Sequence, residues 1–133
     1  MLVTLTIIHQ DIQAAISLLE HLVTQSHPDK GAVAHARWKL SRASGARLKF
    51  LEESVYPALV AGATGDEEAA IQNLRTENLP IRAESIAHVG KWHIDAIMAD
   101  WAGYQQASHA MRASMRARIA KEAAILYPIL KRI

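Results

Sequence analysis

The spacing of apolar residues along the chain constrains its fold more than any other feature. Apolar side chains recur every three to four positions, and no stretch alternates apolar and polar residues over six positions. Between residues 4 and 24, for example, Ile8, Ile12, Ala15 and Leu19 fall on one face of a helix. This periodicity, together with the abundance of alanine, predicts an all-α protein.

Loops that contain proline and glycine divide this pattern into segments. The predicted helices span residues 4–24, 29–60, 66–78, 81–98 and 101–128, with Asp29 and Asp100 as candidate N-cap residues. Pro57 is expected to kink or end the second helix, and Pro80 to restart or bend the third segment. Four main helices with short connections predict an up-down antiparallel four-helix bundle, which forms a single domain over residues 1–133.

Composition excludes several classes of protein. The absence of cysteine rules out a disulfide scaffold, a thiol nucleophile and zinc or iron–sulfur sites with cysteine ligands. A formal net charge of +2 is too small to indicate nucleic-acid binding. No apolar run approaches the roughly 18 residues of a membrane helix, and the first residues lack the basic start of a signal peptide. We therefore expect a cytoplasmic protein without a membrane or nucleic-acid partner.

Two predicted helices end in related sequences. Residues 48–59 read LKFLEESVYPAL and residues 119–130 read IAKEAAILYPIL, so each carries Glu, then Tyr-Pro, then a closing Leu. With His9 near the start of the first helix, this pattern resembles the hemerythrin-like family, also called the HHE cation-binding domain. The resemblance covers about residues 5–130. It implies a four-helix bundle that holds two irons between its helices.

The resemblance also assigns ligand positions, and this chain departs from most of them. The family pattern has a His ten residues before each Pro and a Glu four residues after that His, so that both reach one metal pair. In the second helix these positions hold Arg47 and Leu51, and in the fourth they hold Arg118 and Glu122. Neither arginine can act as a ligand, because a guanidinium remains protonated and has no lone pair to donate.

The remaining candidates for metal ligands are few. His9 stands at the family's first ligand position, and Glu122 keeps the glutamate of the fourth helix. In the third segment the candidates are His88 and His93, of which His88 fits the expected position better. The possible metal set is therefore His9, His88 and Glu122, and we expect no normal di-iron centre and no cofactor.

The two arginines suggest what replaces the metal. Arg47 and Arg118 lie on core-directed faces, and buried cations need partners. Glu122 is one helical turn from Arg118 and can pair with it. We predict a polar cluster of Arg47, Arg118 and Glu122 in the former metal site. The alternative is a small anion bound between the two arginines. We also expect Tyr56 and Tyr127, each of which precedes a proline, to pack at the end of the bundle and not to act as catalytic phenols.

A second basic group is expected to be solvated rather than functional. The residues concerned are Arg112, Arg116, Lys121, Arg37, Lys39 and Arg42. Nothing in the sequence resembles a nucleophile elbow, a phosphate-binding loop or the paired Glu-x-x-His of ferritin-like oxidases. We therefore expect a non-catalytic sensor or interaction module that binds an unknown protein or forms a homodimer. The alternative is a protein that binds iron or another cation through His9, His88 and Glu122, with an oxygen- or redox-related role.

Overall fold

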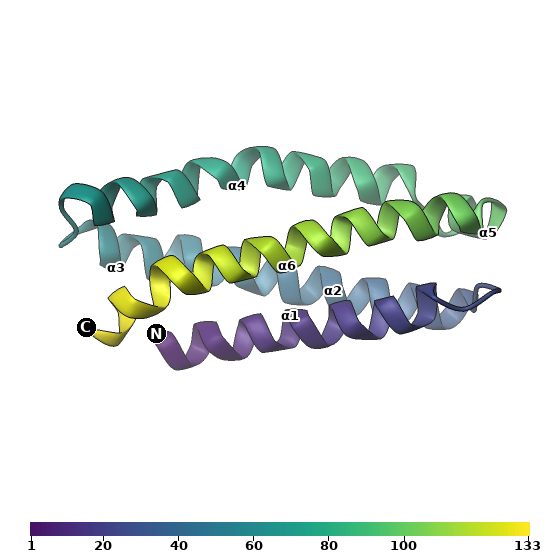
Figure 1. The fold of residues 1–133 in the computed structure, drawn as a ribbon, viewed down its shortest axis with the longest axis horizontal. Coiled ribbons are helices and arrows are strands. Elements are labelled where there is room, and N and C mark those ends of the chain that lie inside the picture. The colour runs from purple at the N-terminus through teal and green to yellow at the C-terminus, as the bar shows by residue number, and fades with distance from the viewer.

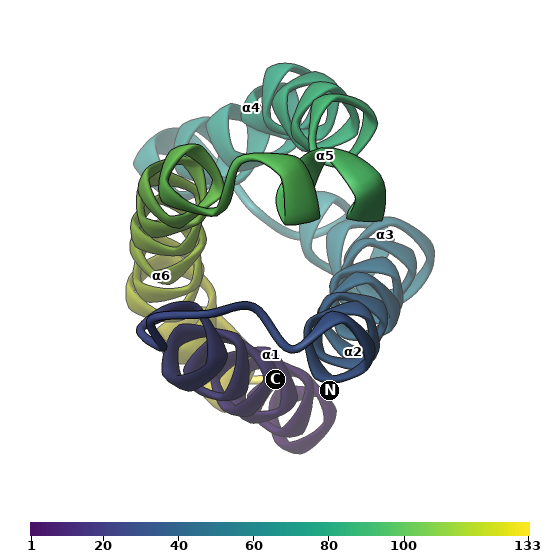
Figure 2. The same ribbon diagram turned by 90° about the vertical axis from the view of Figure 1, so that its right-hand side faces the viewer.

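The computed structural model describes residues 1–133, and all of its regular elements are helical, which confirms the all-α prediction. The elements are α1 (Leu2–Val23), α2 (Lys30–Phe50), the π-helical turn η1 (Leu51–Val55), α3 (Tyr56–Val60), α4 (Gly65–Lys91), α5 (Ile94–Ala99) and α6 (Trp101–Lys131). The longest helices, α1, α2, α4 and α6, run side by side along the long axis of the molecule (Figure 1). Viewed end-on, they surround a common interior (Figure 2).

Side-chain caps define where several helices begin. Asp29 accepts a hydrogen bond from the Ala32 amide at 3.0 Å and starts α2, as predicted. Asp100 accepts from the Gly103 amide at 3.0 Å and starts α6, also as predicted. Each cap satisfies an amide that the first helical turn leaves without a partner.

The chain stays helical through Pro57, although the α-helical geometry of α2 gives way to a π-helical turn just before it. The residues before it form the π-helical turn Leu51–Val55, and the amide of Tyr56 bonds to the carbonyl of Leu51, five residues back. A wide turn of this kind accommodates one extra residue within a helix. Beyond this turn the chain passes Pro57 and continues as α3, with the proline in the first turn of that helix.

The predicted division of the third segment at Pro80 is wrong. The helix α4 continues through Pro80 to Lys91, and the chain leaves helical geometry at Trp92. Trp92 is buried in the core, and Nδ1 of His93 accepts a hydrogen bond from the Ala96 amide at the start of α5. A buried tryptophan and a new cap therefore fix the break, whereas one missing hydrogen bond at Pro80 does not.

The apolar core consists of two separate clusters. The first lies toward α5 and contains Ile12, Ala15, Ile16, Leu19, Val23, Val33, Ala36, Leu40, Trp92, Ile97, Tyr104 and Ile119. The second lies toward α3 and the chain termini and contains Leu5, Leu51, Val55, Tyr56, Leu59, Ile71, Leu74, Leu126, Ile129 and Leu130. On α1 and α6 the residues between the two clusters are His9 and Glu122, both buried. A polar layer thus separates the two apolar regions.

The helix α1 meets the length and composition of a membrane span. Its most apolar 18-residue window has a mean hydropathy of 1.4, so the expectation that no segment reaches this threshold is wrong. This is weak evidence, because core helices of soluble proteins pass the same test. In this fold 33% of the window is buried, and α1 packs against α2 and α6.

Candidate functional site

The polar layer is centred on Glu122, a fully buried carboxylate on α6. Its two oxygens accept hydrogen bonds from Nε of Arg47 at 2.9 and 3.0 Å, and Nη2 of Arg47 bonds to Oε2 as well. Nε of Arg118, one helical turn earlier on α6, donates to Oε2 at 3.0 Å. Nε2 of His9 lies 2.9 Å from Oε1. Three side chains from three helices therefore surround one carboxylate.

The local sequence explains how these groups come together. Arg47 lies one helical turn before Leu51, and Leu51 is fully buried at the position where the family resemblance implies a glutamate. Without a second carboxylate from this helix, Glu122 is the only acidic group that Arg47 reaches. The structure therefore joins Arg47, Arg118 and Glu122, the three residues assigned to the polar cluster from the sequence.

Asn78 on α4 belongs to the same cluster, and the sequence analysis missed it. Its Oδ1 accepts hydrogen bonds from Nη2 of Arg118 at 2.8 Å and from Nη2 of Arg47 at 3.3 Å. A single asparagine has no spacing signal that distinguishes it from a surface residue. The burial of Asn78 one turn after Leu74 is visible only in the folded chain.

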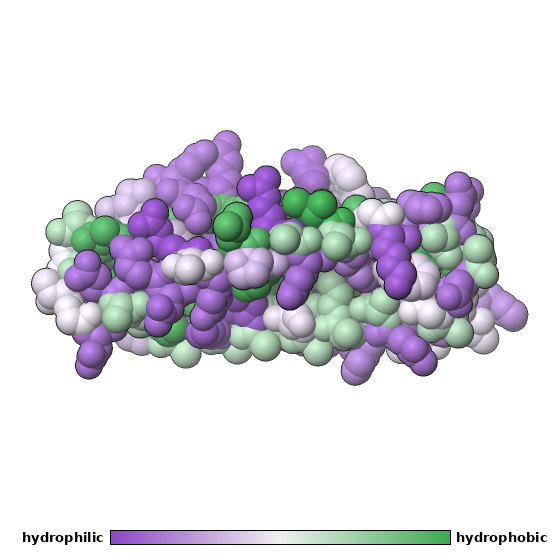
Figure 3. Space-filling view, turned by 90° about the horizontal axis from the view of Figure 1, so that it is seen from above, coloured by the Kyte–Doolittle hydropathy of each residue, from purple (hydrophilic) through white to green (hydrophobic).

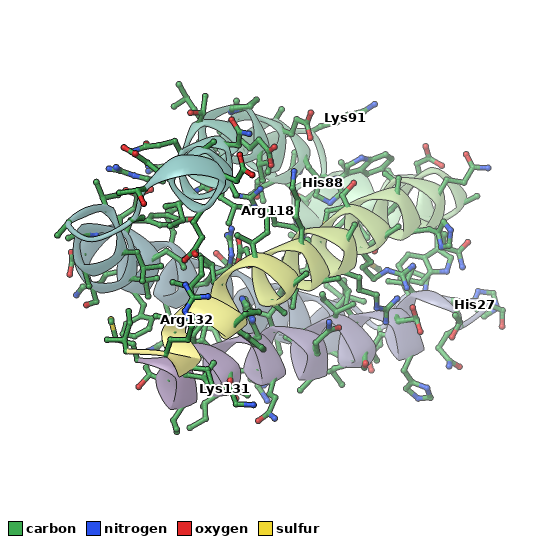
Figure 4. The ribbon with its side chains drawn as sticks, turned by 60° about the vertical axis from the view of Figure 1, so that its left-hand side comes forward. His27, His88, Lys91, Arg118, Lys131 and Arg132 are labelled. Atoms are coloured by element: carbon green, nitrogen blue, oxygen red, sulfur yellow. The ribbon has the colours of Figure 1, made fainter.

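Arg118 connects the cluster to the outer edge of α4. Its Nη2 donates to the carbonyl of Leu74 at 2.6 Å, and its Nη1 donates to Oε2 of Glu77 at 2.6 Å. Glu77 also accepts from Lys121 at 2.8 Å. Figure 4 shows Arg118 between α6 and α4. Glu77 thus adds a second negative charge beside the cluster, which Arg118 shares with Lys121.

Tyr127 contacts the cluster through its hydroxyl as well as packing near the end of α6, and the sequence analysis missed this contact. Its hydroxyl lies 2.6 Å from Nδ1 of His9, and the two rings stack with their centroids 5.6 Å apart. Because Nε2 of His9 faces the carboxylate of Glu122, we assign the ring proton to Nε2. Nδ1 then accepts the hydroxyl proton of Tyr127. Tyr56, by contrast, is fully buried and its hydroxyl has no partner.

The electrostatics keep the cluster ionised. Burial alone would raise the pKa of Glu122, but its hydrogen bonds to Arg47 and His9 and the charge of Arg118 outweigh this and lower the pKa to about 2. Burial would lower the pKa of Arg47, yet the adjacent Glu122 raises it overall. At neutral pH the carboxylate and the guanidinium are therefore both charged.

The predicted metal set is not assembled. His9 and Glu122 are adjacent, but the ring of His88 lies beside Tyr104, with the centroids 6.2 Å apart. His88 is ten residues beyond Asn78 on α4, a displacement of about 15 Å along a helix. No group of three or more His, Asp or Glu side chains is placed to hold a metal ion. The structure therefore places His88 apart from His9 and Glu122, a separation that depends on the register of the third segment, which its sequence does not fix.

The space between Arg47 and Arg118, where a bound anion was the alternative, already holds internal acceptors. The carboxylate of Glu122 occupies the position between the two guanidinium groups, and Asn78 bridges them on the other side. An external anion there would have to displace a fully buried internal one.

One arginine of the basic face that was expected to be solvated is buried and forms an ion pair. Arg112 is only 4% exposed, and its Nη1 donates to Oε2 of Glu20 at 3.0 Å. Its Nε bonds to the carbonyl and hydroxyl oxygens of Ser108. Arg116 reaches the same Glu20 oxygen at 2.7 Å from a more exposed position. Arg112 lies seven residues before Ile119, on the buried face of α6.

No protein-family model, curated protein or solved structure matches the chain. What can be said of its function therefore depends on the residues and geometry described above.

Proposed function

We propose that the chain is a hemerythrin-like four-helix bundle that has lost its metal chemistry and acts as a non-catalytic sensor or interaction module. One observation carries this proposal. The buried carboxylate of Glu122, at a position where the family has a metal ligand, accepts hydrogen bonds from Arg47, Arg118 and His9. Two guanidinium groups thus stand where the family pattern has histidines.

The chemistry of this carboxylate supports the proposal. A metal ligand must offer a lone pair to the cation, and the lone pairs of Glu122 already accept several charged or polar donors. A divalent cation in the same place would also face two positive charges at close range. Metal binding would therefore require the arginines to leave the interior.

The test is metal content, compared between the native chain and a variant with the family's donor set. Untagged protein, purified without chelator and incubated anaerobically with ferrous iron, is expected to hold no stoichiometric metal. The triple variant Arg47→His, Leu51→Glu, Arg118→His places the family's residue types at the three departed positions. It is expected to gain metal while its circular dichroism spectrum remains helical.

The competing function is a protein that binds iron or another cation and has an oxygen- or redox-related role. The adjacency of His9 and Glu122, at 2.9 Å, is the observation that favours it. About two irons in each native chain, the family's complement, would establish this function and overturn the non-catalytic one. Loss of that iron in a His9→Ala variant would identify the ligand.

We propose that the chain binds another protein or a second copy of itself. We place this interaction in the cytoplasm and propose no nucleic-acid partner. Large apolar side chains stand exposed on α4, with Leu79 at 77%, Ile86 at 63% and Val89 at 55%. Figure 3 looks onto this face and shows apolar side chains among polar ones. Two-fold homodimers are the most frequent oligomers, so a second copy is the first partner to test.

A further inference from the structure

A pocket opens on the surface directly beside the buried cluster. Its volume is about 190 Å³, and it is lined by Leu48, Glu52, Arg75, Asn78, Leu79 and Arg82. The four α4 residues follow one another at intervals of three, one and three, so they form one face of that helix. Two of them are arginines, and the wall opposite comes from the end of α2 and from η1.

The amide of Asn78 has a fixed orientation in this pocket. Its carbonyl oxygen accepts from both Arg47 and Arg118, so the NH₂ group must point the other way. That NH₂ group lies 3.5 Å from Oε1 of Glu52, the outer limit of a hydrogen bond. Asn78 is 8% exposed, and it therefore offers a buried donor that is hardly used.

The two arginines of the pocket are also unpaired. Neither Arg75 nor Arg82 takes part in a salt bridge, although the other ion pairs of the chain engage most of its buried cations. The guanidinium carbon of Arg75 lies 5.7 Å from the centre of the Tyr56 ring. This contact limits the freedom of the Arg75 side chain before any ligand arrives.

We propose that this pocket binds a phosphate group. Two guanidinium groups and an amide N–H are all donors, so the pocket favours an anion that offers several acceptor oxygens. A phosphate offers more oxygens and a higher charge, and arginine pairs with it in a two-pronged geometry. In the unliganded protein Glu52 is the one acidic wall, and its carboxylate competes with the phosphate for Asn78.

Asn78 also links the pocket to the buried cluster. The residue that would donate to the phosphate is the one whose carbonyl holds Arg47 and Arg118. Phosphate binding therefore acts on the ion pairs around Glu122 through one side chain. The phosphate proposal names a ligand for the sensor role, and its functional meaning rests on the proposed function. Phosphate binding and metal content are measured in separate experiments, so either proposal can fail without the other.

The experiment is an NMR titration of the ¹⁵N-labelled full chain with inorganic phosphate at constant ionic strength. Saturable shifts of the Asn78 side-chain amide are expected, together with smaller shifts around Glu122. Arg75→Gln and Arg82→Gln should each weaken binding about tenfold, the effect of losing a charge-assisted contact. The matched control is Arg42→Gln, because Arg42 is exposed and lies against Trp38, away from the pocket.

Substitution of Glu52, the acidic residue of the pocket, should change phosphate affinity in the opposite direction. Glu52→Gln is expected to tighten phosphate binding several-fold, whereas Glu53→Gln, which makes the same change of charge at the neighbouring exposed residue, is expected to have little effect. Equal effects of the two substitutions, equal binding of acetate, or no saturation by phosphate would each overturn the proposal. A parallel titration with phenyl phosphate distinguishes the free ion from the phosphate of a larger molecule. Tighter binding of the ester would assign the remaining pocket volume to its organic part.

Discussion

Nε of Arg47 on α2 lies within 3.0 Å of both carboxylate oxygens of Glu122 on α6, although 75 residues separate the two along the chain. This pair, reinforced by Arg118, holds α2 and α6 together through the middle of the molecule. Because the carboxylate is fully buried, removing Glu122 leaves the guanidinium of Arg47 without its ion-pair partner.

Glu122→Ala is expected to destabilise the protein strongly. It leaves Arg47 and Arg118 without their buried anion, which costs about 3–5 kcal/mol in the free energy of unfolding. Urea denaturation followed by circular dichroism measures this loss. Glu53→Ala, at an exposed position without an ion pair, serves as the control and should change stability by less than about 0.5 kcal/mol. A near-native midpoint for Glu122→Ala would show that the cluster does not support the fold.

Tyr127→Phe is expected to cost about 1–2 kcal/mol, because Nδ1 of His9 loses the hydroxyl that satisfies it. Tyr104→Phe provides the contrast. The Tyr104 hydroxyl is buried without a partner, so its removal should be neutral or stabilising. Thermal denaturation of the two variants compares the two cases directly. Equal losses of stability would mean that the His9–Tyr127 hydrogen bond contributes nothing specific.

Stability should depend on acidic pH through Glu122. Its pKa is about 2 in the folded protein against an ordinary value of 4.5, so the carboxylate stabilises the fold fully above about pH 4.5. This contribution is lost as the pH falls from about 4.5 toward 2, and it amounts to at most about 3 kcal/mol. The measurement is the free energy of unfolding of the native protein minus that of Glu122→Gln, from pH 7 to pH 2.5. The difference should shrink with acidification, and a constant difference would refute the assignment.

Arg112 and Arg116 share the same oxygen of Glu20 but differ in burial, with side chains 5% and 38% exposed. Arg112→Ala should cost about 2 kcal/mol, because it removes buried packing and leaves the Ser108 carbonyl without its side-chain donor. Arg116→Ala should cost less than about 1 kcal/mol, as exposed ion pairs do. Chemical denaturation of both variants tests the order, and the reverse order would contradict the burial of Arg112.

Self-association through α4 has a simple test. Ile86 is 63% exposed on α4, and Ile86→Glu should abolish a dimer that forms through this face while leaving the fold intact. Sedimentation velocity over a range of protein concentrations measures the effect. Ile7→Glu is the control, because Ile7 is 50% exposed on α1 instead. A monomeric native protein at all concentrations would exclude the homodimer and direct attention to other proteins.

The parts of the site that could be predicted are those set by spacing within one helix. The pairing of Arg118 with Glu122 follows from four residues of separation, whatever the rest of the fold. The position of His88 depends on how α4 slides against its neighbours, which no local pattern determines. Tyr127 and Asn78 were missed for a related reason, because each contacts the cluster through a residue on another helix.

The helical segments were predictable from periodicity, but their interruptions were not. Neither Pro57 nor Pro80 ends the helical path of the chain, because the surrounding packing compensates for one missing N–H. The break at Trp92 follows instead from the burial of its ring in the core. Tertiary contacts thus decide where a marginal helix stops.

The π-helical turn at Leu51–Val55 changes the angle around the helix axis that a given number of residues spans. Arg47 precedes Pro57 by ten residues, just as Arg118 precedes Pro128, but only the first interval contains the wide turn. One additional residue in a turn offsets everything beyond it by about 100° around the axis. The two Tyr-Pro sequences are accordingly not equivalent in space. Tyr56 turns fully inward with an unsatisfied hydroxyl, whereas Tyr127 stays half-buried and bonds to His9. Deleting a single residue within Leu51–Val55 would remove this angular offset. The two Tyr-Pro dipeptides would then have equivalent positions around their helix axes.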